Sequence, residues 1–232
     1  AQDALFRQGL QNLQHVLPLV SGVVIASTRT SDTVLRSVSK STPVVVLNRQ
    51  VGGLACVVPD SPRGMRRAVE HLATLGHRHI HYLPGPEASW MNGVRWLAMR
   101  EAAHELGLRE TRLTPAIPTV EGGHHASDEV VSRGVRAVVC YNDVMAMGLM
   151  RGLKARGLQI PQDVSVVGFD NTFASDLVTP RLTTVAAPLT TIGETAIRQV
   201  LAMIGGARPR GDAPTVVPVR LIVRESTGAP RS

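Results

Sequence analysis

The chain has 232 residues, 44% hydrophobic and 19% charged, a balance that suits a globular protein with a real core in one large or two small domains. No apolar run approaches the roughly 18 residues of a membrane helix, and the N-terminus lacks a signal-peptide pattern. The two cysteines, Cys56 and Cys140, argue against a disulfide framework and favour buried thiols in the cytoplasm. The formal net charge of +7 indicates either a polyanionic partner such as nucleic acid or a coding bias towards arginine.

Short β-branched runs alternate along the chain with longer segments of helical period. The predicted strands are Gly22–Ala26, Pro43–Leu47, Ala55–Val58, His79–Leu83, Arg112–Ile117, Ala137–Cys140, Val164–Val167, Thr183–Ala186 and Val216–Val223. The predicted helices are Asp3–Leu17, Asp32–Ser39, Pro62–Leu75, Asn92–Leu106, Glu121–Ser132, Asn142–Arg156 and Leu189–Ile204. Several strands are apolar throughout, which is typical of a parallel sheet covered by helices on both faces. The sequence therefore predicts an α/β fold of doubly wound parallel sheets.

Breaks in this pattern divide the predicted fold into two subdomains. The segment "PGP" at Pro84 directly follows a strand and marks a first crossover; 186–189 and the region near Pro218 mark two more. The first predicted subdomain comprises residues 1–84 and 188–216, and the second comprises residues 85–187 and 217–229. The chain opens on a predicted helix with no strand before it, so we expect the first sheet to lack its first strand–helix unit.

Polar side chains follow several predicted strands, at the edge where open α/β sheets bind ligands. Asn48, Asn142 and Asp170 come shortly after strands, and Arg95 lies on a helix that follows another strand. Amide, carboxylate and guanidinium groups suit neighbouring hydroxyls, each of which is both donor and acceptor. The pattern therefore favours a sugar or polyol ligand. The alternative is that Asn142 and Asp170 only cap the structures that follow them.

Other chemistry is weakly indicated. No Ser–His–Asp or Cys–His arrangement falls at the strand ends, and no glycine-rich phosphate loop is present, so we expect neither an enzyme nor a cofactor. His77, His79 and His81 share one face of a predicted strand, but without a fourth ligand a surface or edge role is favoured over zinc. Trp90 lies in a predicted loop, where it either stacks on a sugar ring or fills a hinge region.

Four motifs in a fixed order carry a family resemblance: "YNDVMAMG", "IPQDVSVVGFDN", "LTTV" and "VRESTG". From about Gly22 to Gly228 the chain resembles the effector-binding core of the lactose-repressor/galactose-repressor family of bacterial transcription regulators. The resemblance implies a periplasmic-binding-protein-like fold whose two lobes are joined by three crossovers and hold a small effector between them. It also implies a homodimer, and a helix-turn-helix domain, absent from this chain, that binds operator DNA.

The resemblance also assigns roles to individual positions. Arg95, Asn142 and Asp170 fall on ligand positions of the family, and Trp90 is kept in the adjoining arm. Asn48 departs from the pattern because it stands where an acidic residue is common. The sequence is thus interpreted as a cytoplasmic, ligand-responsive transcription regulator. The alternative is an exported solute-binding protein for transport, which a signal peptide in the full gene would favour.

Overall fold

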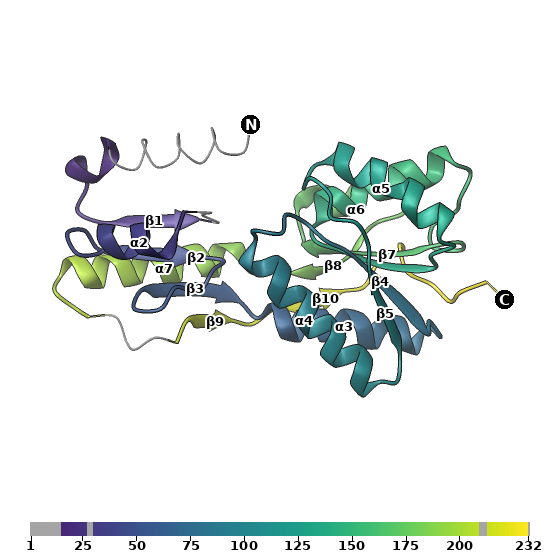
Figure 1. The fold of residues 1–232 in the computed structure, drawn as a ribbon, viewed down its shortest axis with the longest axis horizontal. Coiled ribbons are helices and arrows are strands. Elements are labelled where there is room, and N and C mark those ends of the chain that lie inside the picture. Colours follow the sequence, from purple (N-terminus) through teal and green to yellow (C-terminus); the bar gives the residue numbers. More distant parts are fainter. Residues whose placement is uncertain (1–14, 27–29, 209–212, 232) are drawn as a thin grey trace. The chain divides into compact units, whose positions relative to one another are not determined.

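The computed structural model describes residues 15–26, 30–208 and 213–231. It divides into two compact units, shown in Figure 1. The first unit comprises the chain up to Pro59 together with Pro188–Pro218, and the second comprises Asp60–Ala187 together with the chain from Val219. The chain therefore passes between the units three times, and each unit is assembled from separate stretches. Among the described helices, none has the length and apolarity to cross a membrane.

The first unit contains a four-stranded parallel sheet with the strand order β1-β2-β3-β9. Its described elements are η1 (Leu17–Leu19), β1 (Val23–Ala26), α2 (Asp32–Val38), β2 (Val44–Leu47), β3 (Ala55–Pro59), α7 (Leu189–Ile204) and β9 (Thr215–Val217). Leu35 of α2 packs with Val44 and Val46 of β2 in one apolar cluster. Most of the predicted helix Asp3–Leu17 lies outside the described residues.

The second unit contains a six-stranded sheet with the order β10-β8-β7-β6-β4-β5, in which only β10 is antiparallel to its neighbour. Its strands are β4 (His79–Leu83), β5 (Arg109–Arg112), β6 (Ala137–Cys140), β7 (Ser165–Asp170), β8 (Thr183–Ala186) and β10 (Arg220–Ile222). Its helices are α3 (Ser61–Thr74), α4 (Trp90–Glu105), α5 (Val120–Ser132), α6 (Asp143–Ala155) and η2 (Phe173–Asp176). Figure 1 shows α3 and α4 below this sheet and α5 and α6 above it.

Side chains of successive residues in the central strands point alternately to the two faces of this sheet. Val139 and Val167 belong to the core cluster that includes α3 and α4, whereas Val138 and Val166 belong to the cluster that includes α6. All four side chains are fully buried. This explains why the strands read as continuous apolar runs, as expected for a parallel sheet covered on both faces.

The first predicted subdomain boundary, after residue 84, was wrong. Strand β4 pairs with β6 and therefore belongs to the second unit, so the boundary lies between Pro59 and Asp60. Pro84 and Gly85 form a loop at the end of β4 within that unit, where the N–H of Gly85 donates to the side chain of Asn92. A Pro-Gly signal marks a turn but carries no information on which sheet the strand has joined. The other two predicted crossovers coincide with the divisions after Ala187 and Pro218.

Three predicted strands also differ from the observed ones. The strand expected at Arg112–Ile117 lies earlier, at Arg109–Arg112, because an edge strand tolerates polar residues and Pro115 cannot donate to a ladder. The strand expected to stop before Gly168 continues to Asp170. The strand expected at Val216–Val223 is two strands, β9 and β10, which belong to different sheets.

The segment after β10 is hydrogen-bonded to the start of β7 in the second unit. Ser226 O accepts from Val166 N at 2.8 Å, and Ser226 Oγ donates to Val166 O at 2.6 Å. His77 Nε2 lies 3.0 Å from Gly228 O. The motif "VRESTG" is therefore attached to the second unit through the buried Ser226, which is 60 residues from Val166 in sequence.

Candidate functional site

The carboxyl ends of β4, β6 and β7 meet at one edge of the six-stranded sheet, because these strands are parallel neighbours. Arg95 reaches this edge from α4. The Tyr141–Asn142 segment follows β6, and Asp170 is the last residue of β7. The structure therefore brings the segments that carry Arg95, Asn142 and Asp170 together within the second unit.

Arg95 links the other two segments. Its Nη1 donates to the backbone oxygen of Tyr141, and its Nη2 donates to Asp170 Oδ1 at 3.4 Å. The guanidinium carbon lies 3.9 Å from the ring centre of Phe169 and 5.2 Å from that of Tyr141. Arg95 is only 4% exposed. A buried cation of this kind is stabilised by the carboxylate, the carbonyl and the aromatic faces together.

The Nε atom of Arg95 is buried and has no hydrogen-bond partner among the described residues. A guanidinium carries five N–H donors in a fixed fork, and satisfying them all inside a protein is geometrically demanding. Arg95 therefore keeps one donor without a partner in the described part of the chain.

Asp170 and Asn171 form a strained turn at this edge. Their φ angles are 105° and 54°, in a region that side-chain-bearing residues rarely adopt. The Asp170 side chain remains 36% exposed. Burial raises the pKa of its carboxyl above the ordinary value, and the Arg95 guanidinium acts in the opposite direction. A partly exposed acceptor held by a buried cation is suited to accept hydrogen bonds from hydroxyl groups.

Asn142 caps α6, as the alternative interpretation of the sequence proposed. Its Oδ1 accepts from the N–H of Met145 at 2.9 Å. This bond does not involve the side-chain NH₂ group. Capping and ligand contact are therefore compatible for Asn142, and its ligand role stays a prediction.

Asp143, the next residue, also follows strand β6 but was not among the predicted ligand residues. It is fully buried, and its carboxylate accepts bonds from Thr172 and Thr184. Burial raises the pKa of this carboxyl to about 6, although the bonds from Thr184 and Thr172 oppose the shift. The only sequence signal for Asp143 is its place after Asn142 in the motif "YNDVMAMG". That signal does not reveal its partners Thr172 and Thr184.

Trp90 is the first residue of α4 and is half-buried. The tryptophan whose stacking the structure records is Trp96, with a centroid distance of 6.1 Å to Tyr82. Asn92 is buried, and its Oδ1 accepts from Tyr82 Oη at 3.0 Å and Gly85 N at 3.1 Å, which anchors the loop beside Trp90. Contact between Trp90 and a ligand remains a prediction.

Asn48 lies in the first unit, just after β2, with a φ angle of 57°. Its N–H donates to Val57 O at 3.1 Å. Asn48 and the cluster around Arg95 therefore lie in different units. The ligand role of Asn48 also remains a prediction.

Two of the three histidines considered as metal ligands, His77 and His79, have hydrogen-bond partners within the second unit. His79 hydrogen-bonds Thr111 at 2.8 Å and its ring lies 4.0 Å from that of His81, while burial lowers the pKa of His81 to about 4. No group of three candidate metal ligands occurs in the described ranges. Burial raises the pKa values of Cys56 and Cys140, which keeps both thiols protonated and unreactive.

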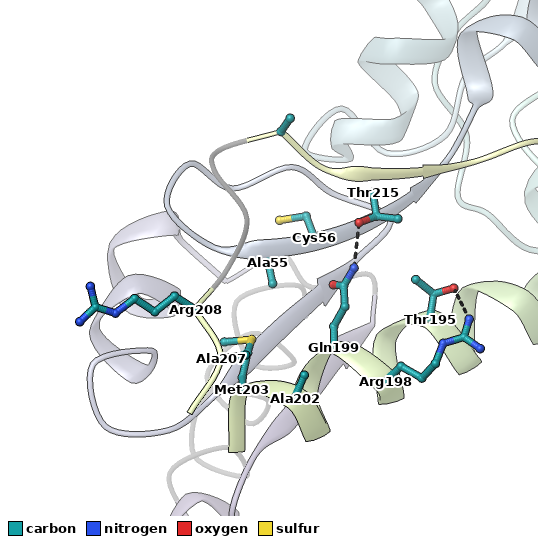
Figure 2. A pocket seen from close by; sticks show the side chains of 11 residues that line it. Ala55, Cys56, Thr195, Arg198, Gln199, Ala202, Met203, Ala207, Arg208 and Thr215 are labelled. Atoms are coloured by element: carbon teal, nitrogen blue, oxygen red, sulfur yellow. Dashed lines mark hydrogen bonds between the residues drawn. The ribbon is translucent and has the colours of Figure 1, made fainter. Parts of the chain in front are cut away.

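A separate pocket of about 610 Å³ lies in the first unit between α7 and the start of β3, and Figure 2 shows its lining. Gln199 Nε2 donates to Thr215 Oγ1 at 2.8 Å, and Arg198 Nη2 donates to Thr195 Oγ1 at 3.4 Å. These polar groups bond to one another along the wall. None of the predicted ligand residues lines this pocket.

Comparison with known proteins places this geometry in context. The family pattern of the periplasmic binding protein-like domain matches residues 69–227. The transcriptional regulator MalR of Streptomyces coelicolor is 36% identical over 180 residues, which are 75% of this chain and 52% of MalR. The regulator GalR of Escherichia coli is 32% identical over 231 residues, which are 97% of this chain and 66% of GalR. The chain thus spans about half the length of MalR and two thirds of GalR.

Solved structures similar to this chain are also LacI family regulators. A LacI family regulator from Enterococcus faecalis with bound ribose has a TM-score of 0.84 at 28% identity, covering 93% of this chain and 82% of that one. A LacI family regulator from Arthrobacter in complex with lactose has a TM-score of 0.83 at 28% identity, covering 94% and 83%. The lac repressor dimer bound to operator has a TM-score of 0.83 at 27% identity, covering 94% and 77%.

Proposed function

This chain belongs to the periplasmic binding protein-like domain family, in the LacI/GalR group of transcriptional regulators, and we propose that it is the part of such a regulator that senses a small effector. The observation that carries the proposal is the cluster of Arg95, Tyr141 and Asp170 at the carboxyl edge of the six-stranded sheet. A guanidinium, a carboxylate and an adjacent amide form a donor and acceptor set without an activated nucleophile. Such a set is suited to binding a ligand.

The proposed effector is a sugar or polyol. Asp170 would accept from hydroxyl groups, while Arg95 and Asn142 would donate to their oxygens. The half-buried Trp90 at the start of α4 would offer an apolar face to a sugar ring. Structures similar to this chain contain ribose or lactose, which supports the ligand class and leaves the individual sugar open.

The regulator would act on operator DNA in the cytoplasm through a helix-turn-helix domain outside this chain. Effector binding would favour one conformational state of the regulator over another. Linkage then requires effector and operator to change each other's affinity by the same factor. The transport alternative is not favoured, since the relatives reported above are named transcriptional regulators.

We further propose that the regulator is a homodimer with part of its interface on η2 and the residue that follows it, Leu177. Phe173 and Leu177 are 84% and 73% exposed, and they lie four residues apart. Arg224 fixes the chain on both sides of these residues, because it donates to Leu182 O at 2.7 Å and to Asn171 Oδ1 at 2.9 Å. Two large apolar side chains on a fixed support suit a self-complementary contact, and the similar lac repressor structure is a dimer.

Calorimetric titration with ribose, lactose and cellobiose tests the effector proposal. At least one of these sugars is expected to bind the wild-type chain. The Asp170→Ala variant is expected to fold like the wild type and to show no measurable binding of that sugar. The matched control is Asp128→Ala, whose carboxylate is 69% exposed on α5. Sugar affinity that survives Asp170→Ala unchanged would show that the assigned cluster is not the binding site.

A further inference from the structure

Asp143 holds three segments of the second unit together from the first position of α6. Its Oδ2 accepts from the backbone N–H of Thr172 at 2.7 Å and from Thr172 Oγ1 at 3.3 Å. Its Oδ1 accepts from Thr184 Oγ1 at 2.5 Å. One buried carboxylate thereby connects the start of α6, the segment after β7 and strand β8.

We propose that Asp143 is a positioning residue that fixes the Asp170–Asn171 turn relative to Asn142, so that these two ligand-facing groups are presented in one fixed arrangement. The proposal rests on the proposed function for its consequence, because Asp170 and Asn142 are the groups assigned to the effector. The positioning itself depends only on contacts within the second unit.

The turn requires such a support. Asp170 and Asn171 both have positive φ angles, and residues with a Cβ persist there only when their surroundings over-determine the conformation. Asn171 N donates to Thr184 Oγ1 at 3.3 Å, and the same hydroxyl donates to Asp143. Thr172 N donates directly to Asp143. The two residues after Asp170 are therefore tied to one carboxylate, one of them through Thr184 Oγ1.

Gly168 makes room for this arrangement. A Cβ at Gly168 would lie 2.2 Å from Asp143 Oδ1 and 2.8 Å from Leu182 Cδ2. A contact at 2.2 Å is impossible for real atoms, so a side chain at Gly168 and the observed position of Asp143 exclude each other. The glycine of "VVGFD" and the acid of "YND" are therefore two halves of one packing arrangement.

A simpler role for Asp143 would be to stabilise α6, since an acid in the first turn favours a helix N-terminus. The contacts argue for more than this. The side-chain bonds of Asp143 go to Thr172 and Thr184, which are 29 and 41 residues away in sequence, while Asn142 already caps the helix. Two titratable groups face Asp143: the carboxylate of Asp170 and the thiol of Cys140. The charge of Asp170 raises the pKa of Asp143, and Asp170 is itself paired with Arg95.

Residue-resolved amide hydrogen exchange on the full chain, without sugar, tests the positioning. In Asp143→Ala the amides of Thr172 and Asn171 are expected to exchange about tenfold faster or more, because Thr172 loses a buried acceptor. The amides of Val139 and Val167 should keep their protection. Asp143→Asn should rescue most of the effect, because its oxygen accepts from Thr172 N and its NH₂ donates to Thr184 Oγ1.

Thr184→Val provides a second route if Asp143→Ala fails to fold. It keeps the carboxylate and removes the hydroxyl, so Asn171 should lose protection while Thr172 keeps it. Unchanged exchange at Asn171 in Thr184→Val, or at both amides in a folded Asp143→Ala, would overturn the positioning role.

Titration of the same variants with ribose, lactose and cellobiose separates the two proposals. A sugar that binds the wild type is expected to bind Asp143→Ala about tenfold more weakly or worse and Asp143→Asn within about threefold of the wild type. If amide exchange shows that the turn is loosened in Asp143→Ala but the sugar binds this variant as tightly as the wild type, the proposed effect of Asp143 on sugar binding is overturned. Absence of binding to the wild type itself would count against the proposed effector class and leave the exchange result standing.

Discussion

Arg95 Nη2 lies 3.4 Å from Asp170 Oδ1, and the two residues come from different elements, α4 and β7. The cation is almost fully buried, whereas the carboxylate is about one third exposed at 36%. Arg95 thus holds Asp170 in place, and the exposed part of Asp170 is the part that would contact the proposed effector. This asymmetry determines what should happen when each is changed.

Arg95→Met is expected to abolish sugar binding and to lower the free energy of unfolding by roughly 1–3 kcal/mol, because Tyr141 O loses its donor and Asp170 loses its cation. The pKa of Asp170 should rise further, since the Arg95 guanidinium lowers it. Urea unfolding, sugar titration and carboxyl NMR measure the three effects. Arg100→Met on the same helix, where the arginine is 58% exposed, should change stability by less than about 0.5 kcal/mol. Similar behaviour of the two variants would contradict the assigned role.

Gly168→Ala is expected to destabilise the second unit by about 1–3 kcal/mol, because its methyl group would collide with Asp143 and Leu182. Gly93→Ala is the matched control. Gly93 lies within α4 with no atom within 4 Å of an added Cβ, so the same change should stabilise by about 0.5–1 kcal/mol. Urea unfolding of both variants measures the difference. Equal free energies of unfolding would show that Gly168 has free space, against the observed packing.

The carboxyl of Asp143 predicts a pH dependence of stability. Its pKa is raised by burial from 3.8 to about 6, so the folded chain binds this proton more tightly than the unfolded chain does. The resulting stabilisation is fully present below pH 3.8 and is lost as the pH rises through about 6. Asp143→Asn is neutral at every pH. The free energy of unfolding of Asp143→Asn, relative to that of the wild type, should therefore increase by about 2 kcal/mol between pH 4.5 and 7.5.

Urea unfolding of both chains across this pH range provides the measurement. His81, whose pKa is lowered to about 4, contributes a slope of opposite sign in both chains, and this contribution cancels in the difference. A difference between the chains that does not vary with pH would show that Asp143 has an ordinary pKa in the folded state.

Phe173→Ser combined with Leu177→Ser is expected to weaken homodimer formation by about tenfold or more, because two large apolar contacts would be lost from the interface. Sedimentation over a range of concentrations measures the dissociation constant. Ile117→Ser alters a side chain that is 69% exposed elsewhere in the second unit and should leave association unchanged. A chain that sediments as a monomer before mutation, or a dimer that tolerates the double change, would remove η2 from the interface.

The fold class and the family were predictable from the sequence, and the comparisons confirm both. Continuous apolar strands, helix caps such as Asn142 and four motifs in order carry that information locally. The first boundary was not predictable, because the pairing of β4 with β6 depends on residues more than 50 positions apart, such as His81 and Val138. A turn signal at Pro84 reports only a change of chain direction.

The site was predictable in part. Strand ends and the family resemblance pointed to Arg95, Asn142 and Asp170, and the structure brings their segments together. The role of Asp143 was not predictable, because its partners Thr172 and Thr184 lie 29 and 41 residues away and carry no pattern of their own. The strained φ angles of Asp170 and Asn171 are equally invisible in the sequence, since neither residue is glycine.

The three passages of the chain between its units have a consequence for synthesis on the ribosome. The first unit needs Pro188–Pro218 to supply α7 and β9, and the second needs the stretch from Val219 to supply β10 and the contacts of Ser226 with β7. Neither unit can complete its sheet while those late residues are still untranslated. The nascent chain must therefore wait with apolar surface uncovered, which makes chaperone protection most valuable during translation.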